Sequence, residues 1–166
     1  TKQAFEDILD FYADAFGMHV ITLKLFDIYG PDDPRPKLVN LLVKAMKSGE
    51  TLGMSPGNQV LDLVHIDDVT RAFEVCAQQL LDSASCHHHA RYSVSSGIPL
   101  SVRQLVAVLE QVSGKAINVS FGARPYRGRE VMLPWQGGQQ LPGWHATTDT
   151  RAGLASMLSS LERQEI

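Results

Sequence analysis

The sequence has few cysteines, no cluster of basic residues and no long apolar run. Its two cysteines, Cys76 and Cys86, are not in a CxxC spacing and indicate free thiols in a reducing compartment, so we expect a cytoplasmic protein. The net charge of −3 comes without a Lys or Arg run, which argues against nucleic acid or an anionic membrane as a partner. The longest apolar stretches, such as residues 38–43, are far shorter than the ~20 residues that a membrane span requires.

Glycine is present, but not in the pattern that binds a dinucleotide. None of the 13 glycines falls in a GxGxxG spacing, so the chain has no loop of the kind that cradles a pyrophosphate at the start of a helix. The length of 166 residues, of which 44% are apolar, suffices for one hydrophobic core. We therefore expect residues 1–166 to form a single domain.

Helical and strand patterns alternate along the chain. Helices are predicted over residues 2–16, 38–46, 67 or 68 to 81, 102–112 and 149 or 150 to 161. Gly17, Gly49 and Gly114 are expected to end the first, second and fourth, and Ser101 with Gln104 to cap the start of the fourth. Strands are predicted over residues 19–26, 51–54, 60–64, 91–95 and 116–121, and loops over residues 29–34, 82–89 and 123–142. The alternation indicates an α/β fold with parallel strands. Because the first element is a helix, we expect an open sheet edge beside it.

Four segments carry a family pattern. They are residues 1–6, Leu23-Lys24-Leu25-Phe26-Asp27-Ile28-Tyr29-Gly30-Pro31, Asp62-Leu63-Val64-His65-Ile66-Asp67-Asp68-Val69 and Tyr92-Ser93-Val94-Ser95-Ser96-Gly97. In this order they resemble the extended short-chain dehydrogenase/reductases, most closely their nucleotide-sugar epimerases and dehydratases. The resemblance implies an incomplete Rossmann-like fold: the C-terminal part with its substrate-binding subdomain, with the N-terminal dinucleotide-binding half absent.

Lys2 resembles the end of the family's YxxxK motif, whose Tyr would lie just before residue 1. Residues four apart share a helix face, so the ammonium group stabilises a phenolate that acts as a base. The resemblance implies that Lys2 is a catalytic and cofactor-binding residue, that Pro31 is also cofactor-binding, and that the full-length enzymes use NAD or NADP. Without the Tyr and the glycine-rich loop, we expect this chain to bind no cofactor. The alternative for Lys2 is a solvated side chain at a frayed terminus.

The resemblance also implies a substrate site formed by Asp27, Tyr29, Pro31 and Arg127. Asp27 stands where the family has an Asn; a carboxylate only accepts hydrogen bonds and repels phosphate. Leu61 stands where many related enzymes have an Arg that binds the diphosphate. The alternative for Asp27 is a turn residue that caps its own backbone, and the alternative for Arg127 is a solvated surface turn. Lys24 stands where an Arg is common in the family, and its position suggests that the charge has a structural role.

Three other groups have a structural interpretation beside a functional one. His65, Asp67 and Asp68 could form a catalytic cluster, but we favour a strand-to-helix junction in which an Asp caps exposed amides. The run Cys86-His87-His88-His89 could bind a metal, but adjacent ligands rarely converge on one ion, which favours an adventitious site. Trp135 and Trp144 either cover a nucleobase or pack in the core, and packing is the better interpretation for Trp144.

Two hypotheses of function follow. The first is the C-terminal substrate-binding portion of an NAD(P)-dependent nucleotide-sugar epimerase, dehydratase or reductase, inactive as an isolated chain; its substrate is a nucleotide-sugar, with a weak preference for a CDP-sugar from residues 31–63. The second is a non-catalytic module that binds or assembles without redox chemistry, which Asp27 and Leu61 favour. Family members usually dimerise through the helix that bears YxxxK, so we expect a homodimer through the first helix, whose apolar strip consists of Phe5, Leu9, Tyr12 and Phe16.

Overall fold

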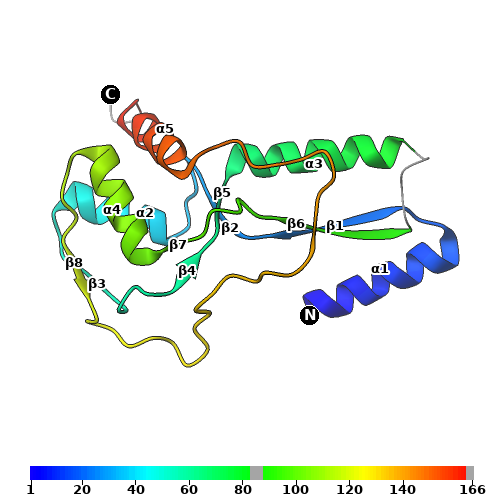
Figure 1. Ribbon diagram of the computed structural model, residues 1–166, viewed down its shortest axis with the longest axis horizontal. Helices are drawn as coiled ribbons and strands as arrows, with labels where there is room; N and C mark the ends of the chain where they lie inside the picture. Colours follow the sequence, from blue (N-terminus) through cyan, green and yellow to red (C-terminus); the bar gives the residue numbers. More distant parts are fainter. Residues whose placement is uncertain (83–87, 164–166) are drawn as a thin grey trace.

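The computed structural model describes residues 1–82 and 88–163 and has the expected α/β architecture (Figure 1). The helices are α1 (Lys2–Phe16), α2 (Leu38–Ser48), α3 (Ile66–Leu81), α4 (Val102–Ser113) and α5 (Thr150–Arg163). The strands are β1 (Val20–Leu25), β2 (Asp27–Tyr29), β3 (Leu52–Met54), β4 (Val60–Leu61), β5 (Leu63–His65), β6 (His89–Val94), β7 (Leu100–Ser101), β8 (Val119–Phe121) and β9 (Gln139–Gln140). All five predicted helices are present.

The principal sheet is parallel and is covered by helices on both faces. β1 pairs with β6 along its whole length, from Val20 opposite His89 to Leu25 opposite Val94, and β9 pairs with the other side of β6. Figure 1 shows α1 and α3 on opposite faces of the β1–β6 pair. β1 is an edge strand of this sheet within the described part of the chain, which confirms the open edge expected beside the first helix.

Several predicted boundaries are wrong, each for a local reason. Tyr29 was expected in a loop but ends β2, because residues 27–29 pair with β5. The strand expected over residues 60–64 is two strands, interrupted at Asp62, whose carboxylate accepts hydrogen bonds from Ser95 Oγ (2.5 Å) and Ser96 N (2.7 Å). β6 begins at His89 rather than at residue 91, since its pairing with β1 extends that far. The short β7 and β9 carry no apolar pattern that would have predicted them.

The helix caps were predicted well, with one exception. Gly17, Gly49 and Gly114 end their helices in the left-handed conformation, with φ between 65° and 72°. Ser101 and Gln104 form the expected capping box. The prediction that Asp67 or Asp68 caps α3 is wrong: the helix begins one residue earlier, and the cap is His65, whose Nδ1 accepts a hydrogen bond from Asp67 N (3.3 Å).

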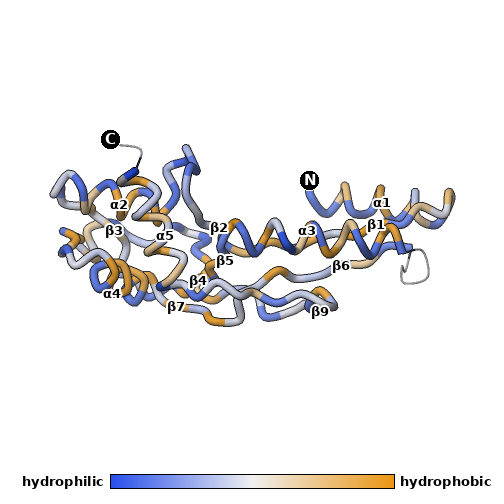
Figure 2. Tube along the Cα trace, turned by 90° about the horizontal axis from the view of Figure 1, so that it is seen from above, coloured by the Kyte–Doolittle hydropathy of each residue, from blue (hydrophilic) through white to orange (hydrophobic). Residues whose placement is uncertain are grey.

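The buried apolar residues form two clusters, on either side of the β2–β5 pair. One lies among α2, α4 and α5 and includes Leu42, Leu105 and Leu154. The other lies between β1, β6 and α3 and includes Val64, Val94 and Trp144. Figure 2 shows hydrophobic residues concentrated on α4 and along β1. Trp144 packs in the core as expected, and its Nε1 donates to Asp68 O (3.0 Å).

A buried carboxylate fixes the segment that leads into α5. Asp68 is fully buried and accepts hydrogen bonds from Thr147 N (3.1 Å), Thr147 Oγ1 (3.2 Å) and Thr148 N (3.1 Å). It also forms an ion pair with Arg71 one helical turn away. A carboxylate with this many donors is stable away from water. Asp68 therefore holds α3 to the residues that precede α5.

We predict that Asp68→Ala lowers the free energy of unfolding by about 3–5 kcal/mol, because it leaves Arg71 and two backbone amides without their acceptor. Urea denaturation followed by circular dichroism measures this change. The matched control is Asp67→Ala, which removes a neighbouring carboxylate whose side chain is 75% exposed and should change stability by less than about 1 kcal/mol. Equal losses in the two variants would contradict this role of Asp68.

Candidate functional site

The principal functional candidate is a cavity of about 560 Å³ beside the carboxyl ends of the parallel strands. The chain leaves β1 at Leu25 and enters β2 directly at Asp27, so Asp27 lies at the edge where open α/β sheets bind ligands. The volume is within the range of small-molecule sites. The polar and charged side chains among the lining residues are Asp27, Tyr29, Asp33, Lys37, Asn40, Ser55, Gln59, Arg124, Arg127 and Glu130.

The two arginines of the cavity come from a loop that is tied to the opposite wall. Arg124 N donates to Met54 O (3.0 Å) at the end of β3, and Asn58 N donates to the hydroxyl of Tyr126 (3.1 Å). These contacts hold residues 124–127 against the turn that follows β3. No described carboxylate forms an ion pair with the guanidinium of Arg124 or Arg127, so both charges are available to a ligand in the cavity.

Most of the acidic groups of the cavity already have hydrogen-bond or ion-pair partners within the protein. Asp33 is bound bidentately by Arg35, at 2.7 and 2.8 Å, and this pairing holds the pKa of the Asp33 carboxyl well below its usual range. Glu130 Oε2 accepts from Arg127 N (3.3 Å). Lys37 donates to Ile28 O (3.1 Å) and lies 3.5 Å from Asp33, so its charge is already partly compensated.

Asp27 has a different environment. It pairs through its backbone with Leu63 in the β2–β5 ladder, and no hydrogen bond to its carboxylate occurs within the described residues. The interpretation of Asp27 as a turn residue that caps its own backbone is therefore wrong. Partial burial raises the pKa of the Asp27 carboxyl, nearby Lys37 lowers it, and Asp62 raises it further, with a net increase.

Tyr29 lies at the cavity wall, but its hydroxyl is in the core. The residue is 4% exposed, its ring meets the ring of His65 edge-on at 5.3 Å, and α5 approaches so closely that a side chain at Gly153 would overlap the Tyr29 hydroxyl. Burial, with a smaller effect of Asp149, raises the pKa of Tyr29 to about 12. Burial also lowers the pKa of His65. Both rings are therefore neutral near pH 7; Tyr29 packs in the core, and His65 packs against it while capping α3.

The other predicted site residues lie elsewhere. Pro31 follows β2 but does not line the cavity, and Lys2 is exposed at the start of α1. Leu61 does line the cavity, where it contributes an apolar side chain. Trp135 is 55% exposed and stacks on Phe26, with ring centroids 6.5 Å apart. Arg124 and Lys37 were not singled out from the sequence; the three arginines of residues 124–129 were the available signal.

The predicted structural charge and the histidine run can also be placed. Lys24 forms an ion pair with Glu6 (2.5 Å), which confirms its structural role. Cys86 and His87 lie outside the described residues, His88 stacks on His19, and His89 contacts Asp10 and Thr22. Within residues 1–82 and 88–163, no group of three His, Cys, Asp or Glu side chains is arranged to hold a metal ion, and no helix is long and apolar enough to cross a bilayer.

The parallel strands, their covering helices and a cavity at the strand ends are those of the ligand-binding part of an open α/β protein. Residues 1–88 match the NAD dependent epimerase/dehydratase family, and the chain belongs to this family. It is 32% identical over 133 residues to a CDP-abequose synthase of Yersinia pseudotuberculosis, covering 80% of this chain and 45% of that protein. It is 24% identical over 166 residues to a CDP-abequose synthase of Salmonella typhimurium, covering 97% of this chain and 54% of that protein.

Solved structures share the fold. A UDP-glucose 4-epimerase of Thermotoga maritima with UDP-glucose has a TM-score of 0.83 at 22% identity, over 99% of this chain and 53% of that one. A Thermus thermophilus UDP-glucose 4-epimerase in complex with NAD has a TM-score of 0.76 at 21% identity, over 96% of this chain and 51% of that one. The chain spans about half the length of the relatives and structures that it matches.

The family's dinucleotide is only partly matched by the residues of this chain. Lys2 is at the start of α1, the end of the helix that lies toward the carboxyl end of β1, which suits a contact with a ribose. The pyrophosphate has no counterpart to bind it, because the sequence lacks a GxGxxG loop. The residues present therefore do not fit a complete dinucleotide site, and no step of chemistry is assigned to NAD here.

We predict that Asp27→Asn raises the free energy of unfolding at pH 7 by about 0.5 kcal/mol. A carboxyl whose folded-state pKa is raised opposes folding once it ionises, so the stability gained by the variant over the wild-type chain should grow as pH rises from about 4 toward neutrality. Urea denaturation at pH 4 and pH 7 measures the difference, with Asp14→Asn on exposed α1 as the control. A destabilising effect of Asp27→Asn at pH 7 would show that the carboxylate is favourably bound.

Proposed function

We propose that this chain is the nucleotide-sugar-binding portion of an NAD(P)-dependent epimerase, dehydratase or reductase. The observation that carries the proposal is the pair of uncompensated guanidinium groups, Arg124 and Arg127, in a cavity at the carboxyl ends of parallel strands. A diphosphate is the group that such a pair binds best, because each guanidinium can donate two parallel hydrogen bonds to phosphate oxygens. The two arginines would supply the positive charge that is missing because Leu61 stands where many related enzymes have an Arg.

The opposite wall of the cavity suits the base of a nucleotide. Leu52, Gly53 and Met54 of β3 present an apolar surface beside Arg124. The names of the curated relatives from Yersinia and Salmonella refer to CDP-sugars, which supports cytidine as the base. Asp27 lies in the same cavity and accepts hydrogen bonds only, so we assign it to a sugar hydroxyl, away from the phosphates that it would repel.

Redox chemistry would require groups that lie outside these residues. On the cofactor side, Lys2 and Pro31 are the residues of this chain that would contact the nicotinamide ribose of NAD or NADP. We propose that the 166-residue chain by itself binds a nucleotide-sugar but does not turn it over.

Calorimetric titration of the chain with CDP tests the binding proposal. We expect saturable binding, and Arg127→Gln should weaken it about 10- to 100-fold, since a hydrogen bond to a charged group contributes about 1.5–3 kcal/mol. Arg129→Gln is the matched control, because Arg129 is exposed on the same loop but does not line the cavity, and it should leave the affinity within about twofold. Absence of binding by the folded wild-type chain, or equal losses in the two variants, would refute the site.

A second candidate function is self-association without redox chemistry. Five large apolar side chains of α1 are more than 40% exposed: Phe5, Ile8, Phe11, Tyr12 and Phe16. Three of these rings contact one another, with centroids 5.4 to 6.2 Å apart. An apolar strip of this size on one helix is typical of an interface, and we propose that it forms a homodimer with a second copy of the chain.

The double variant Phe5→Ser, Phe16→Ser should weaken self-association at least about tenfold, because truncating a central apolar contact in an interface costs more than about 1 kcal/mol. Sedimentation equilibrium over a range of protein concentrations measures the dissociation constant. Ile98→Ser is the control, since Ile98 is as exposed as Phe5 but lies outside α1. A wild-type chain that stays monomeric at high concentration would rule out the dimer while leaving nucleotide binding unaffected.

A further inference from the structure

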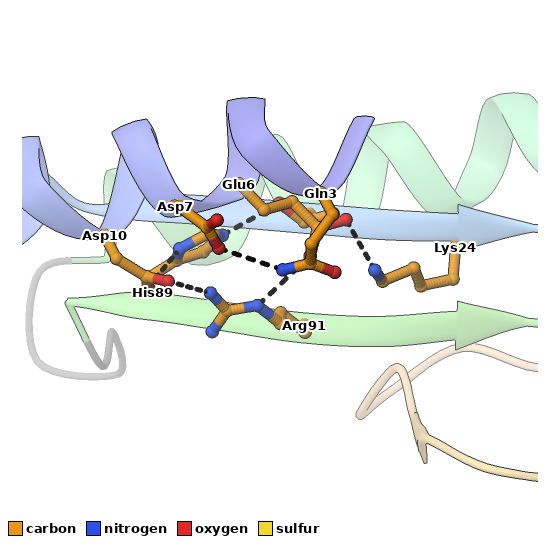
Figure 3. Close-up of polar contacts among 8 residues, drawn as sticks. Gln3, Glu6, Asp7, Asp10, Lys24, His89 and Arg91 are labelled. Carbon is orange, nitrogen blue, oxygen red and sulfur yellow. Dashed lines mark hydrogen bonds and ion pairs between the residues drawn. The ribbon is translucent and has the colours of Figure 1, made fainter. Parts of the chain in front are cut away.

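The first helix contacts the sheet through its charged side. Glu6 is buried, and its carboxylate binds Lys24 Nζ of β1 (2.5 Å) and Arg91 Nε of β6 (3.3 Å) (Figure 3). One turn further along, Asp10 binds Arg91 Nη2 (2.5 Å) and His89 Nδ1 (2.8 Å). These two carboxylates thus bridge both strands of the parallel pair.

The partners of the two carboxylates are themselves held in place. His89 Nε2 is 2.8 Å from Thr22 Oγ1 of β1, so both ring nitrogens are occupied. Binding by Lys24, and to a lesser degree by Arg91, lowers the pKa of Glu6, and binding by Arg91, then by His89, lowers the pKa of Asp10. Both groups are therefore ionised near neutral pH, and the contact is a network of opposite charges.

The rotation of α1 about its own axis follows from these contacts. An amphipathic helix normally turns its apolar side to the sheet, yet here the aromatic strip faces outward, and the only fully buried residue of the helix is the small Ala13. Apolar burial would favour the opposite rotation, with the strip against the sheet. The paired charges of Glu6 and Asp10 stabilise the observed rotation over that alternative.

This rotation determines where Lys2 is directed. Lys2 precedes Glu6 by four residues and lies on the same side of the helix. Figure 1 shows that α1 runs antiparallel to β1, and Glu6 binds Lys24 near the carboxyl end of that strand, so Lys2, about 6 Å further along the helix, lies toward the carboxyl edge of the sheet. A helix turned to bury its aromatic strip would direct Lys2 away from that edge.

We propose that Glu6 and Asp10 are positioning residues, which clamp α1 in the rotation that directs Lys2 toward the carboxyl edge of the sheet and keeps the aromatic strip exposed. The role given to Lys2 rests on the proposed function; the clamp itself rests on the contacts. The residue pairs act as a unit, since Arg91 binds both carboxylates. Neutral replacements of the same shape should therefore release the helix without changing the packing volume.

The test uses Glu6→Gln with Asp10→Asn, in chain labelled with ¹³C at alanine methyl groups. In the wild-type chain a soluble gadolinium probe should broaden the methyl signals of exposed Ala4 and Ala15 but not that of buried Ala13. In the variant we expect Ala13 to become accessible and the amide hydrogens of α1 to exchange at least about tenfold faster, while those of β6 remain protected. Asp7→Asn is the matched control, because Asp7 is exposed on the same helix and binds only Gln3.

Two further arms separate a clamp from a general loss of stability. The exchanged pair Glu6→Lys with Lys24→Glu restores opposite charges at one contact and should return Ala13 protection at least halfway to the wild-type level. An Ala13 signal as protected in the double variant as in Asp7→Asn would overturn the clamp. Titration of the same double variant with CDP distinguishes the two proposals. If the variant binds CDP as the wild-type chain does and Ala13 stays protected, the clamp is refuted and the proposed function is not. If Ala13 becomes accessible but neither the wild-type chain nor the variant binds CDP, the proposed function is refuted and the clamp is not.

Discussion

Parallel strand direction is the constraint on which the rest of this structure depends. Because β1 and β6 run the same way, and β2 continues directly from β1 to pair in parallel with β5, their carboxyl ends gather on one side of the molecule. Asp27 and the start of α1 lie on that side, and the connection from β2 to α2 forms one wall of the cavity. The position of the candidate site is thus set by chain direction before any individual side chain contributes.

Charge has two separate uses in the molecule. The buried carboxylates of Glu6, Asp62 and Asp68 are satisfied internally, and each joins segments far apart in sequence. Arg124 and Arg127, in contrast, line a cavity without a described carboxylate partner. Buried carboxylates whose hydrogen bonds are all made within the protein fix the relative positions of the segments they join. Cations without a carboxylate partner in a concave site instead indicate an anionic ligand. The distinction separates structural from functional polar residues here.

The sequence was sufficient to predict the helices, their glycine ends and the parallel α/β class, because these depend on local spacing and on backbone conformation at residues such as Gly17 and Gly114. It was less informative where a long-range contact decides. Asp68 could not be recognised as the acceptor for Thr147, nor Asp62 as a break between two strands, since both contacts cross large sequence separations. Arg127 was predicted for the site through the family resemblance, whereas Arg124 joined it only through the contact with Met54.

The central claim is that the cavity lined by Arg124 and Arg127 binds the diphosphate of a nucleotide-sugar. The most direct measurement is a map of backbone amide chemical-shift changes in the ¹⁵N-labelled chain as a CDP-sugar is added. The account predicts that the largest changes occur at Asp27, Gly53, Arg124 and Arg127, and that α5 is unaffected. Changes centred on α1 or on the α2–α5 side of the molecule, or no changes in a folded chain, would contradict it.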